Sequence, residues 1–147
     1  MRIPLVERCA GLRRLFVLAL LLAPLAVMAQ SDDWKAPARA AQKKNPLAGD
    51  AQEISVGRDL YLHECAPCHG KTGRGDGVAA PNLEPKPRDF TETRVAKESD
   101  GALFWKIGEG HRPMPGFDQT ISEDGRWHIV LFLRTLAPAA TQPATRP

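Results

Sequence analysis

Residues 65–69 have the sequence Cys65-Ala66-Pro67-Cys68-His69. Cys-x-x-Cys-His is the pattern at which a haem is attached covalently to a protein. Two thiols at this spacing add across the two vinyl groups of the ring, and the adjacent imidazole is held within reach of the iron. The pentapeptide therefore predicts one haem c, attached through Cys65 and Cys68 and ligated by His69.

The first 29 residues have the composition of a secretory signal peptide. Arginines precede an uncharged run from Leu15 to Ala29, which ends in small residues suited to cleavage. This run is short against the roughly 20 apolar residues that span a bilayer. We therefore expect cleavage and export to the periplasm. Retention of residues 15–29 as a membrane anchor is the alternative, and it is the one case in which we expect the chain to contact a membrane.

Loss of residues 1–29 would change both the charge and the cysteine content of the chain. Of 20 basic and 17 acidic residues, four basic and one acidic lie in this stretch, so 16 of each sign remain. A chain without net charge gives no reason to expect a nucleic-acid partner. Cys9 would be removed as well, which leaves both remaining thiols in the haem motif.

The rest of the chain divides into three segments by composition. Residues 30–49 are polar and rich in Lys, Ala and Pro, and they predict a flexible leader. Residues 139–147 are rich in Ala, Thr and Pro, and they predict a disordered tail. Residues 50–138 remain as one small domain, in which a haem would be the largest apolar object.

The domain is predicted to begin with a helix that carries the haem motif at its end. Asp50 is a candidate cap, with Glu53 three residues on in a capping-box-like arrangement. Apolar residues at helical spacing lead from Ile54 to Cys65 on one face. The glycine-rich stretch 70–77 then predicts a loop, and the prolines within 81–90 exclude a regular helix there.

Two further helices are predicted in the second half of the domain. One runs from Ser99 to about Gly108, where glycines stop it. The other starts at Ser122 and has apolar residues at positions i, i+3, i+4 and i+7. Its apolar run 129–133 could instead be a buried strand, but the length of the flanking pattern favours a helix. Because no alternating strand pattern is evident, the domain is predicted to be all-α.

A second axial ligand to the iron is expected from Met114. Because Met1 and Met28 lie in the signal peptide, Met114 is the one thioether left after cleavage. The flanking Pro113 and Pro115 restrict the backbone, so a weak sulfur ligand can be held at little cost in ordering.

Other residues compete with this assignment. Met114 could merely fill a gap in the core, as methionine often does. His63 precedes the haem motif and falls on the same side of the ring as His69. His111 would reach the iron only if its loop moved, and His128 is expected in the core or at the surface.

His69 also needs a partner for its second ring nitrogen. Metal-bound histidines usually donate that N–H to a carbonyl or a carboxylate. The Pro81 carbonyl is the candidate acceptor, with Leu83 packed on the ring. The alternative is that both are ordinary loop residues.

Together these residues resemble class I cytochromes c, the small single-haem electron carriers. The resemblance covers about 50–136. It rests on Gly57 and Tyr61, the haem motif with Gly70, Pro81-Asn82-Leu83, Pro113-Met114-Pro115 and the helix from Trp127 to Leu136.

The resemblance implies a fold of three to five helices wrapped around one covalently attached haem. In this family the first and last helices cross near a glycine and an aromatic residue like Gly57 and Tyr61. The partner aromatic would be Trp127 or Phe132. A proline like Pro81 supplies the carbonyl acceptor for the haem-ligating histidine in the family.

The implied activity is one-electron transfer between redox proteins, with both axial positions of the iron filled. The chain would then be an electron carrier and not an enzyme. Basic residues could ring the haem edge and steer an acidic partner, although a merely solvated surface explains them equally well. They are Lys71, Lys86, Arg88, Lys106 and Arg112.

Three alternatives remain open at this point. A haem enzyme or gas sensor would need an open iron site, and the Pro-Met-Pro loop argues against one. A zinc or thiol module without haem would use Cys65, Cys68 and two histidines. The third alternative keeps the haem chemistry, with the chain held in a larger membrane complex by residues 15–29.

Overall fold

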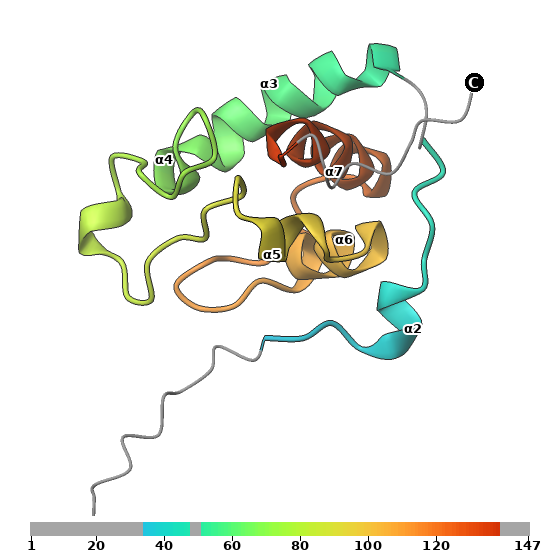
Figure 1. The fold of residues 1–147 in the computed structure, drawn as a ribbon, viewed down its shortest axis with the longest axis horizontal. Helices are drawn as coiled ribbons and strands as arrows, with labels where there is room; N and C mark the ends of the chain where they lie inside the picture. The colour runs from blue at the N-terminus through green and yellow to red at the C-terminus, as the bar shows by residue number, and fades with distance from the viewer. Residues whose placement is uncertain (1–33, 48–50, 139–147) are drawn as a thin grey trace, which may run out of the picture. The chain divides into compact units, whose positions relative to one another are not determined.

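The computed structural model describes residues 34–47 and 51–138. Within these ranges the structure contains helices and no β-strand, which confirms the all-α prediction (Figure 1). None of the described helices is long and apolar enough to cross a membrane. The predicted signal peptide, its alternative as an anchor and the predicted tail at 139–147 lie outside the described residues.

The first and last helices of the domain pack directly on each other. Helix α3 spans Ile54–Glu64 after a 3-10 turn at Ala51–Glu53, and helix α7 spans Glu123–Leu136. A Cβ atom added at Gly57 of α3 would lie 2.0 Å from the carbonyl oxygen of His128 in α7. Only glycine allows the two backbones to approach so closely. The predicted crossing at Gly57 is therefore present.

The start of α3 differs from the predicted capping box. Glu53 occupies the N-cap position and its side chain makes no capping hydrogen bond. The Glu53 carboxylate instead lies 2.7 Å from Nε2 of His128. Asp50 lies outside the described residues.

The last helix forms as predicted, and the strand alternative for 129–133 is wrong. Oγ of Ser122 caps the helix by accepting one of the free N–H groups of its first turn, from Gly125, at 3.1 Å. One face of α7 is buried, through Trp127, Ile129, Val130, Phe132 and Leu133.

Two aromatic pairs fill the core between the helices. The Tyr61 ring, with none of its surface exposed, lies 5.0 Å from the Phe132 ring. Trp127 stacks instead on Phe104, with ring centroids 3.9 Å apart. Phe132 is therefore the aromatic partner of Tyr61 across the crossing.

The middle helix, α6, spans Asp100–Glu109 and has Ser99 as its N-cap. Gly108 lies inside this helix and does not stop it; Gly110 follows its last residue. A short helix, α5 at Thr93–Ala96, precedes it. Four residues are too few for a hydrophobic period, which explains why the sequence pattern did not predict α5.

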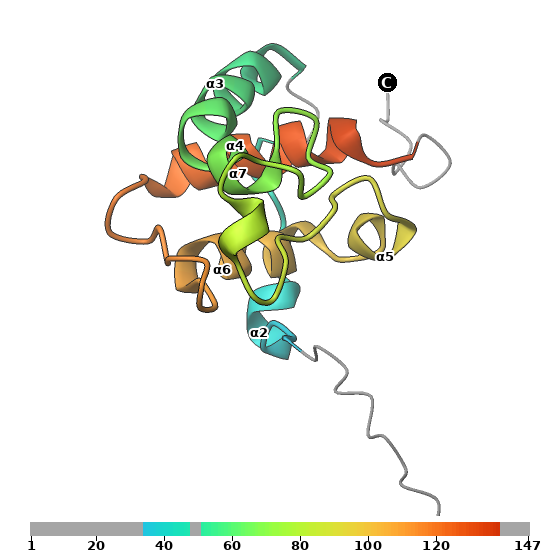
Figure 2. The ribbon, with the colours of Figure 1, turned by 90° about the vertical axis from the view of Figure 1, so that its left-hand side faces the viewer.

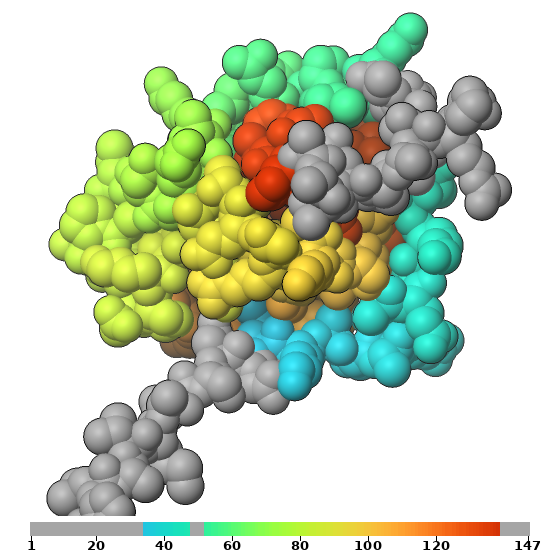
Figure 3. All heavy atoms as spheres, viewed as in Figure 1, coloured from blue at the N-terminus to red at the C-terminus, as the bar shows by residue number. Residues whose placement is uncertain are grey.

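The structure corrects the flexible leader expected over 30–49 in its described part, residues 34–47. This segment contains helix α2 at Ala38–Ala41, and it lies along α6 as part of the packed surface (Figure 3). The Ser99 hydroxyl donates to the Ala41 carbonyl at 2.6 Å. Asn45, only 6% exposed, donates to the Trp127 carbonyl at 3.3 Å. Isolated polar side chains make these two hydrogen bonds, so the periodicity of apolar residues in the sequence could not predict them.

The packed unit consequently begins at Trp34 and not at Asp50. A Cβ atom at Gly101 of α6 would lie 2.2 Å from the carbonyl oxygen of Ala40 in α2. The glycine lets the leader backbone sit directly on the helix. Residues 34–47 are therefore packed as part of the domain.

Candidate functional site

The haem motif forms one continuous turn at the end of α3. Cys65 ends that helix, and Ala66–His69 forms the short helix α4, which faces the viewer in Figure 2. The N–H groups of Cys68 and His69 both donate to the Cys65 carbonyl, at 3.1 and 2.8 Å. Cys65 and Cys68 are both half-buried and are not joined in a disulfide. Both thiols and the imidazole are thus held together by the local backbone.

The His69 side chain is buried and oriented by two contacts. Only 7% of the residue is exposed. Its Nδ1 donates to the Arg88 carbonyl at 3.0 Å, because a carbonyl can only accept. Its ring stacks on Phe90 with centroids 4.5 Å apart. The segment 88–90 therefore fixes both the tautomer and the plane of the imidazole.

This geometry corrects the expected role of Pro81. The Pro81 carbonyl accepts from Nζ of Lys86 at 3.0 Å, and the residue is exposed. The proline-rich segment after it folds back and delivers the Arg88 carbonyl to His69 instead. Leu83 is half-buried just beyond the 3-10 turn Ala80–Asn82.

Burial shifts the ionisation of the site toward neutral forms. It lowers the pKa of His69, against a smaller opposing effect of the hydrogen bond to Arg88. It raises the pKa of Cys65 to about 12, with the negative charge of Glu64 and the neighbouring Cys68 adding to the effect. At neutral pH both groups are therefore uncharged in this environment.

These features fit covalent attachment of a haem. With the proton on Nδ1, the Nε2 atom of His69 carries the lone pair that an iron ligand requires. A cysteine joined to a vinyl group becomes an uncharged thioether, which suits the half-buried position of Cys65. The two cysteines for attachment and the imidazole for ligation are the groups that the motif predicts.

Met114 lies in the loop between α6 and α7 and is half-buried. Its backbone is paired with that of His111 in both directions, at 2.9 and 3.0 Å. The loop rejoins the helix where the Phe117 N–H donates to the Ile107 carbonyl at 3.0 Å. In Figure 1 this loop and α4 both lie toward the left-hand end of the molecule.

Each competing histidine has another partner. Nδ1 of His63, whose side chain is 85% exposed, lies 3.0 Å from the Glu64 carboxylate. His128 pairs with Glu53 on the other face of the helix crossing. His111 is exposed and stacks on Trp34, with centroids 5.1 Å apart.

Two of the basic residues expected at the haem edge are engaged within the chain. Lys86 donates to the carbonyls of Ala80 and Pro81. Lys106 lies 2.5 Å from the Glu98 carboxylate, and its side chain is only 16% exposed. Lys71 and Arg112 are exposed, and Arg88 is half-buried. Two of the five basic residues expected to steer a partner are therefore held in contacts within the chain.

Sequence reasoning missed three contacts around His69. They are the Arg88 carbonyl, the Phe90 ring and the Tyr61 hydroxyl, which donates to the Gly70 carbonyl at 2.7 Å. Every residue type carries a backbone carbonyl, so the sequence could not identify the Arg88 carbonyl as the acceptor. Tyr61 was identified as a helix-crossing residue, but not as a support of the turn that follows His69.

No group of three or more His, Cys, Asp or Glu side chains gathers to hold a metal ion within 34–47 and 51–138.

Comparison with known proteins bears on the whole domain. Residues 52–133 match the family described as Cytochrome C oxidase, cbb3-type, subunit III. The cytochrome bc1 complex cytochrome c subunit of Corynebacterium efficiens is 32% identical over 91 residues, covering 58% of this chain and 27% of that protein. The subunit of the same name from Corynebacterium diphtheriae is 29% identical over 98 residues, covering 63% and 31%. The chain thus spans less than a third of the length of these two relatives.

A solved structure shares the fold. It is a chain of a reducing HAO-like protein complex from Kuenenia stuttgartiensis, with a TM-score of 0.55 and 28% identity. The likeness covers 65% of this chain and 50% of that one. The family match extends over more than half of the sequence and includes both the haem motif and the Met114 loop. The chain therefore belongs to the family of Cytochrome C oxidase, cbb3-type, subunit III, and it is a c-type cytochrome.

Proposed function

We propose that the chain carries one haem c, held by Cys65 and Cys68 and ligated by His69 and Met114, and that it passes single electrons between redox proteins. The observation that carries this proposal is the buried His69 side chain, whose Nδ1 donates to the Arg88 carbonyl at the end of the Cys-x-x-Cys-His turn. When bound, the haem supplies one-electron Fe(III)/Fe(II) chemistry. The single Cys-x-x-Cys-His pattern in the sequence supports a single haem.

The residues around His69 keep the ligand in one state. The Arg88 carbonyl holds the tautomer that leaves Nε2 free, and the Phe90 ring restrains rotation of the imidazole. Because His69 is buried, water has little access to its ring. Ligation that stays constant during electron transfer requires this kind of restraint.

Met114 sets the potential and closes the iron in this proposal. A thioether opposite a histidine raises the reduction potential relative to two histidines. Because His69 and Met114 would both hold the iron of a bound haem, no substrate would need to bind that iron. The chain then acts as an electron carrier, and catalysis at the iron is not part of the proposal.

The partners are other redox proteins outside the cytoplasm. The charge pattern of residues 1–29 supports export to the periplasm, where covalent haem attachment takes place. The relatives named as subunits of a bc1 complex support a second setting, in which the chain is a cytochrome subunit of a larger oxidoreductase. Gentle detergent extraction followed by co-purification separates a free carrier from a complex subunit.

Haem attachment is tested with the double variant Cys65→Ala/Cys68→Ala. We expect the haem stain that survives denaturing electrophoresis in the native chain to disappear. His63→Ala is the matched control, because His63 is an exposed neighbour paired with Glu64. A native chain without covalent haem would overturn the proposal in favour of a thiol or zinc module.

The axial pair is tested at Met114. Met114→Ala should keep the covalent haem, bind carbon monoxide in the reduced state and lower the potential, because a ligand has been removed. Met114→His should keep the iron closed and still lower the potential, because imidazole favours Fe(II) less than a thioether does. An unchanged spectrum and potential in Met114→Ala would remove Met114 from the site. Carbon monoxide binding by the native protein would favour the enzyme or sensor alternative.

A further inference from the structure

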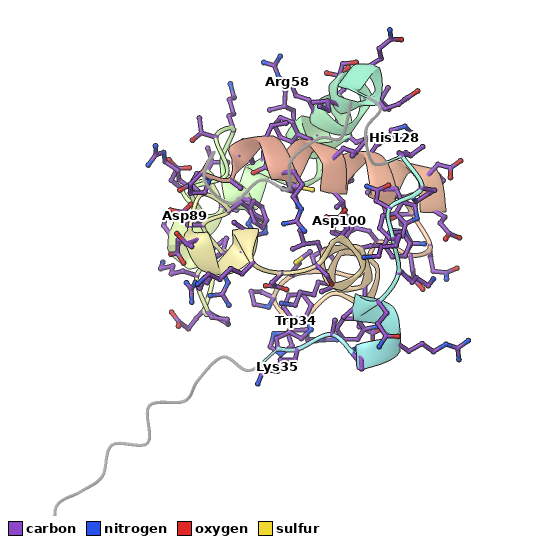
Figure 4. The ribbon with its side chains drawn as sticks, turned by 45° about the vertical axis from the view of Figure 1, so that its right-hand side comes forward. Trp34, Lys35, Arg58, Asp89, Asp100 and His128 are labelled. Carbon is purple, nitrogen blue, oxygen red and sulfur yellow. The ribbon has the colours of Figure 1, made fainter. Side chains whose placement is uncertain are left out.

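Trp34 sits against the loop that carries Met114. Its ring stacks on His111, with centroids 5.1 Å apart and planes 22° from parallel. Trp105 of α6 lies on the same ring at 6.4 Å, and Nζ of Lys106 lies 5.2 Å from its centroid. Figure 4 shows Trp34 beside α6, at the start of the described chain. The half-buried indole is thus packed against residues of α6 and of the loop.

His111 is the point at which this contact reaches Met114. The two residues exchange backbone hydrogen bonds, at 3.0 Å from the His111 N–H and at 2.9 Å from the Met114 N–H. A displacement of His111 therefore displaces the Met114 backbone with it. Trp34 is therefore linked to the Met114 backbone through one ring stack and one backbone pair.

The segment that presents Trp34 is itself anchored to the domain. Ser99 caps α6 and at the same time donates its hydroxyl to the Ala41 carbonyl. Further along, Asn45 is buried and donates to the Trp127 carbonyl. An anchored segment can hold the indole against His111 at little further cost in ordering.

We propose that Trp34 is a positioning residue for Met114, acting through His111. The stacked indole holds the loop closed, so that the methionine sulfur stays on the iron and external ligands do not replace it. It also keeps the His111 imidazole turned to the outside of the loop. This inference rests on the proposed ligation by Met114.

The experiment measures ligand entry into the haem-loaded protein. Imidazole is titrated into the ferric form of Trp34→Ala, and the sulfur-to-iron charge-transfer absorption of that form is recorded. We expect imidazole affinity to rise about three- to tenfold, as removal of one aromatic stack predicts, and the absorption to weaken. Trp34→Phe keeps an aromatic face and should restore both values toward the native ones.

Asn45→Ala is the matched control. It loosens the same leader segment but acts through Trp127, away from the Met114 loop. We expect Asn45→Ala to lower the denaturation midpoint without changing imidazole affinity. Equal increases in imidazole affinity in Asn45→Ala and Trp34→Ala would overturn the proposal, because loosening of the leader would then explain both.

A double-variant cycle tests the route through His111. His111→Ala should raise imidazole affinity as much as Trp34→Ala does. The double variant Trp34→Ala/His111→Ala should raise it little more than either single variant. Fully additive effects would overturn the route through the stack. If Met114→Ala admits imidazole and Trp34→Ala does not, the positioning role of Trp34 fails alone. If Met114→Ala changes nothing, the ligation by Met114 fails first.

Discussion

The two proposed iron ligands are held in very different ways. His69 is buried, lies on a turn that continues α3, and is oriented by the Arg88 carbonyl and the Phe90 ring. Met114 is half-buried on a loop, where its backbone pairs with His111 and an indole covers the outside. The histidine side is therefore part of the core, whereas the methionine side depends on a few contacts at the surface.

This difference predicts a separation of effects between the two regions. Variants on the histidine side should lower the free energy of unfolding of the whole domain, because each disturbs packing or a hydrogen bond in the segments that surround His69. Variants on the methionine side should change ligand binding and potential with a small effect on unfolding. Three variants on the histidine side, given in order of expected effect, test whether the two sides differ in this way.

Gly57→Ala should have the largest effect on stability. The new methyl group would meet the His128 carbonyl at 2.0 Å, and neither backbone can yield without separating the helices. Overpacking of this kind costs about 1–3 kcal/mol and sometimes more. Chemical denaturation followed by circular dichroism measures it.

Gly108→Ala is the matched control for this prediction. Its Cβ would meet Nη1 of Arg126, the end of a flexible side chain, at 2.4 Å. Alanine also favours the helix by about 0.8–1 kcal/mol, so little net loss is expected. An equal loss in both variants would show that the crossing at Gly57 is not special.

Tyr61→Phe should have an intermediate effect. It keeps the ring against Phe132 but removes the hydroxyl that donates to the Gly70 carbonyl at 2.7 Å. We expect a loss of about 1 kcal/mol, because the buried Gly70 carbonyl loses the hydroxyl and keeps only the Gly73 N–H as its donor. Imidazole affinity of the ferric protein should stay within twofold of the native value, roughly 0.4 kcal/mol or less. A clear rise in affinity would show that the two sides are coupled.

Asp89→Asn should have the smallest effect, and the effect should depend on pH. The Asp89 carboxylate accepts from the N–H and the hydroxyl of Thr91, at 2.7 and 2.6 Å. The Thr91 hydroxyl is the main reason that the pKa of Asp89 lies below its usual range, and Arg74 and Arg94 add to it. Because the pKa of Asp89 is lower in the folded state, its carboxylate stabilises the folded state at pH values above the pKa it has in the unfolded chain. That stabilisation is lost as the pH falls through the folded pKa.

The measurement for Asp89 compares unfolding at two pH values. At neutral pH the free energy of unfolding of the native protein should exceed that of Asp89→Asn by only about 0.5 kcal/mol, because solvent screens this largely exposed carboxylate, and the difference should close in strong acid. Thr91→Val removes the hydroxyl and should narrow the same difference. A difference that is independent of pH would assign the effect to packing and not to the carboxylate charge.

Much of the site was accessible from sequence because it is local. Cys65, Cys68 and His69 are within one turn, and the Ser99 and Ser122 caps precede clear helical patterns. The crossing at Gly57 followed from a resemblance to a family. The Pro81 expectation was wrong because the acceptor for His69 is a backbone carbonyl, and the identity of the residue that bears a carbonyl carries no information. The packing of residues 34–47 was missed because isolated contacts hold it, such as the Trp34 ring stack, the Asn45 hydrogen bond and the close backbone approach at Gly101, and these follow no periodic pattern.

The sequence by itself determined the chemistry of attachment, the helical class and the one candidate sulfur ligand, since these depend on residue type and short spacing. The tertiary structure alone decided how the ligands are supported. It chose the Arg88 carbonyl for His69 and Phe132 for Tyr61, and it brought Trp34 onto His111. Contacts between residues far apart in the chain depend on how the whole backbone closes, which short-range patterns do not encode.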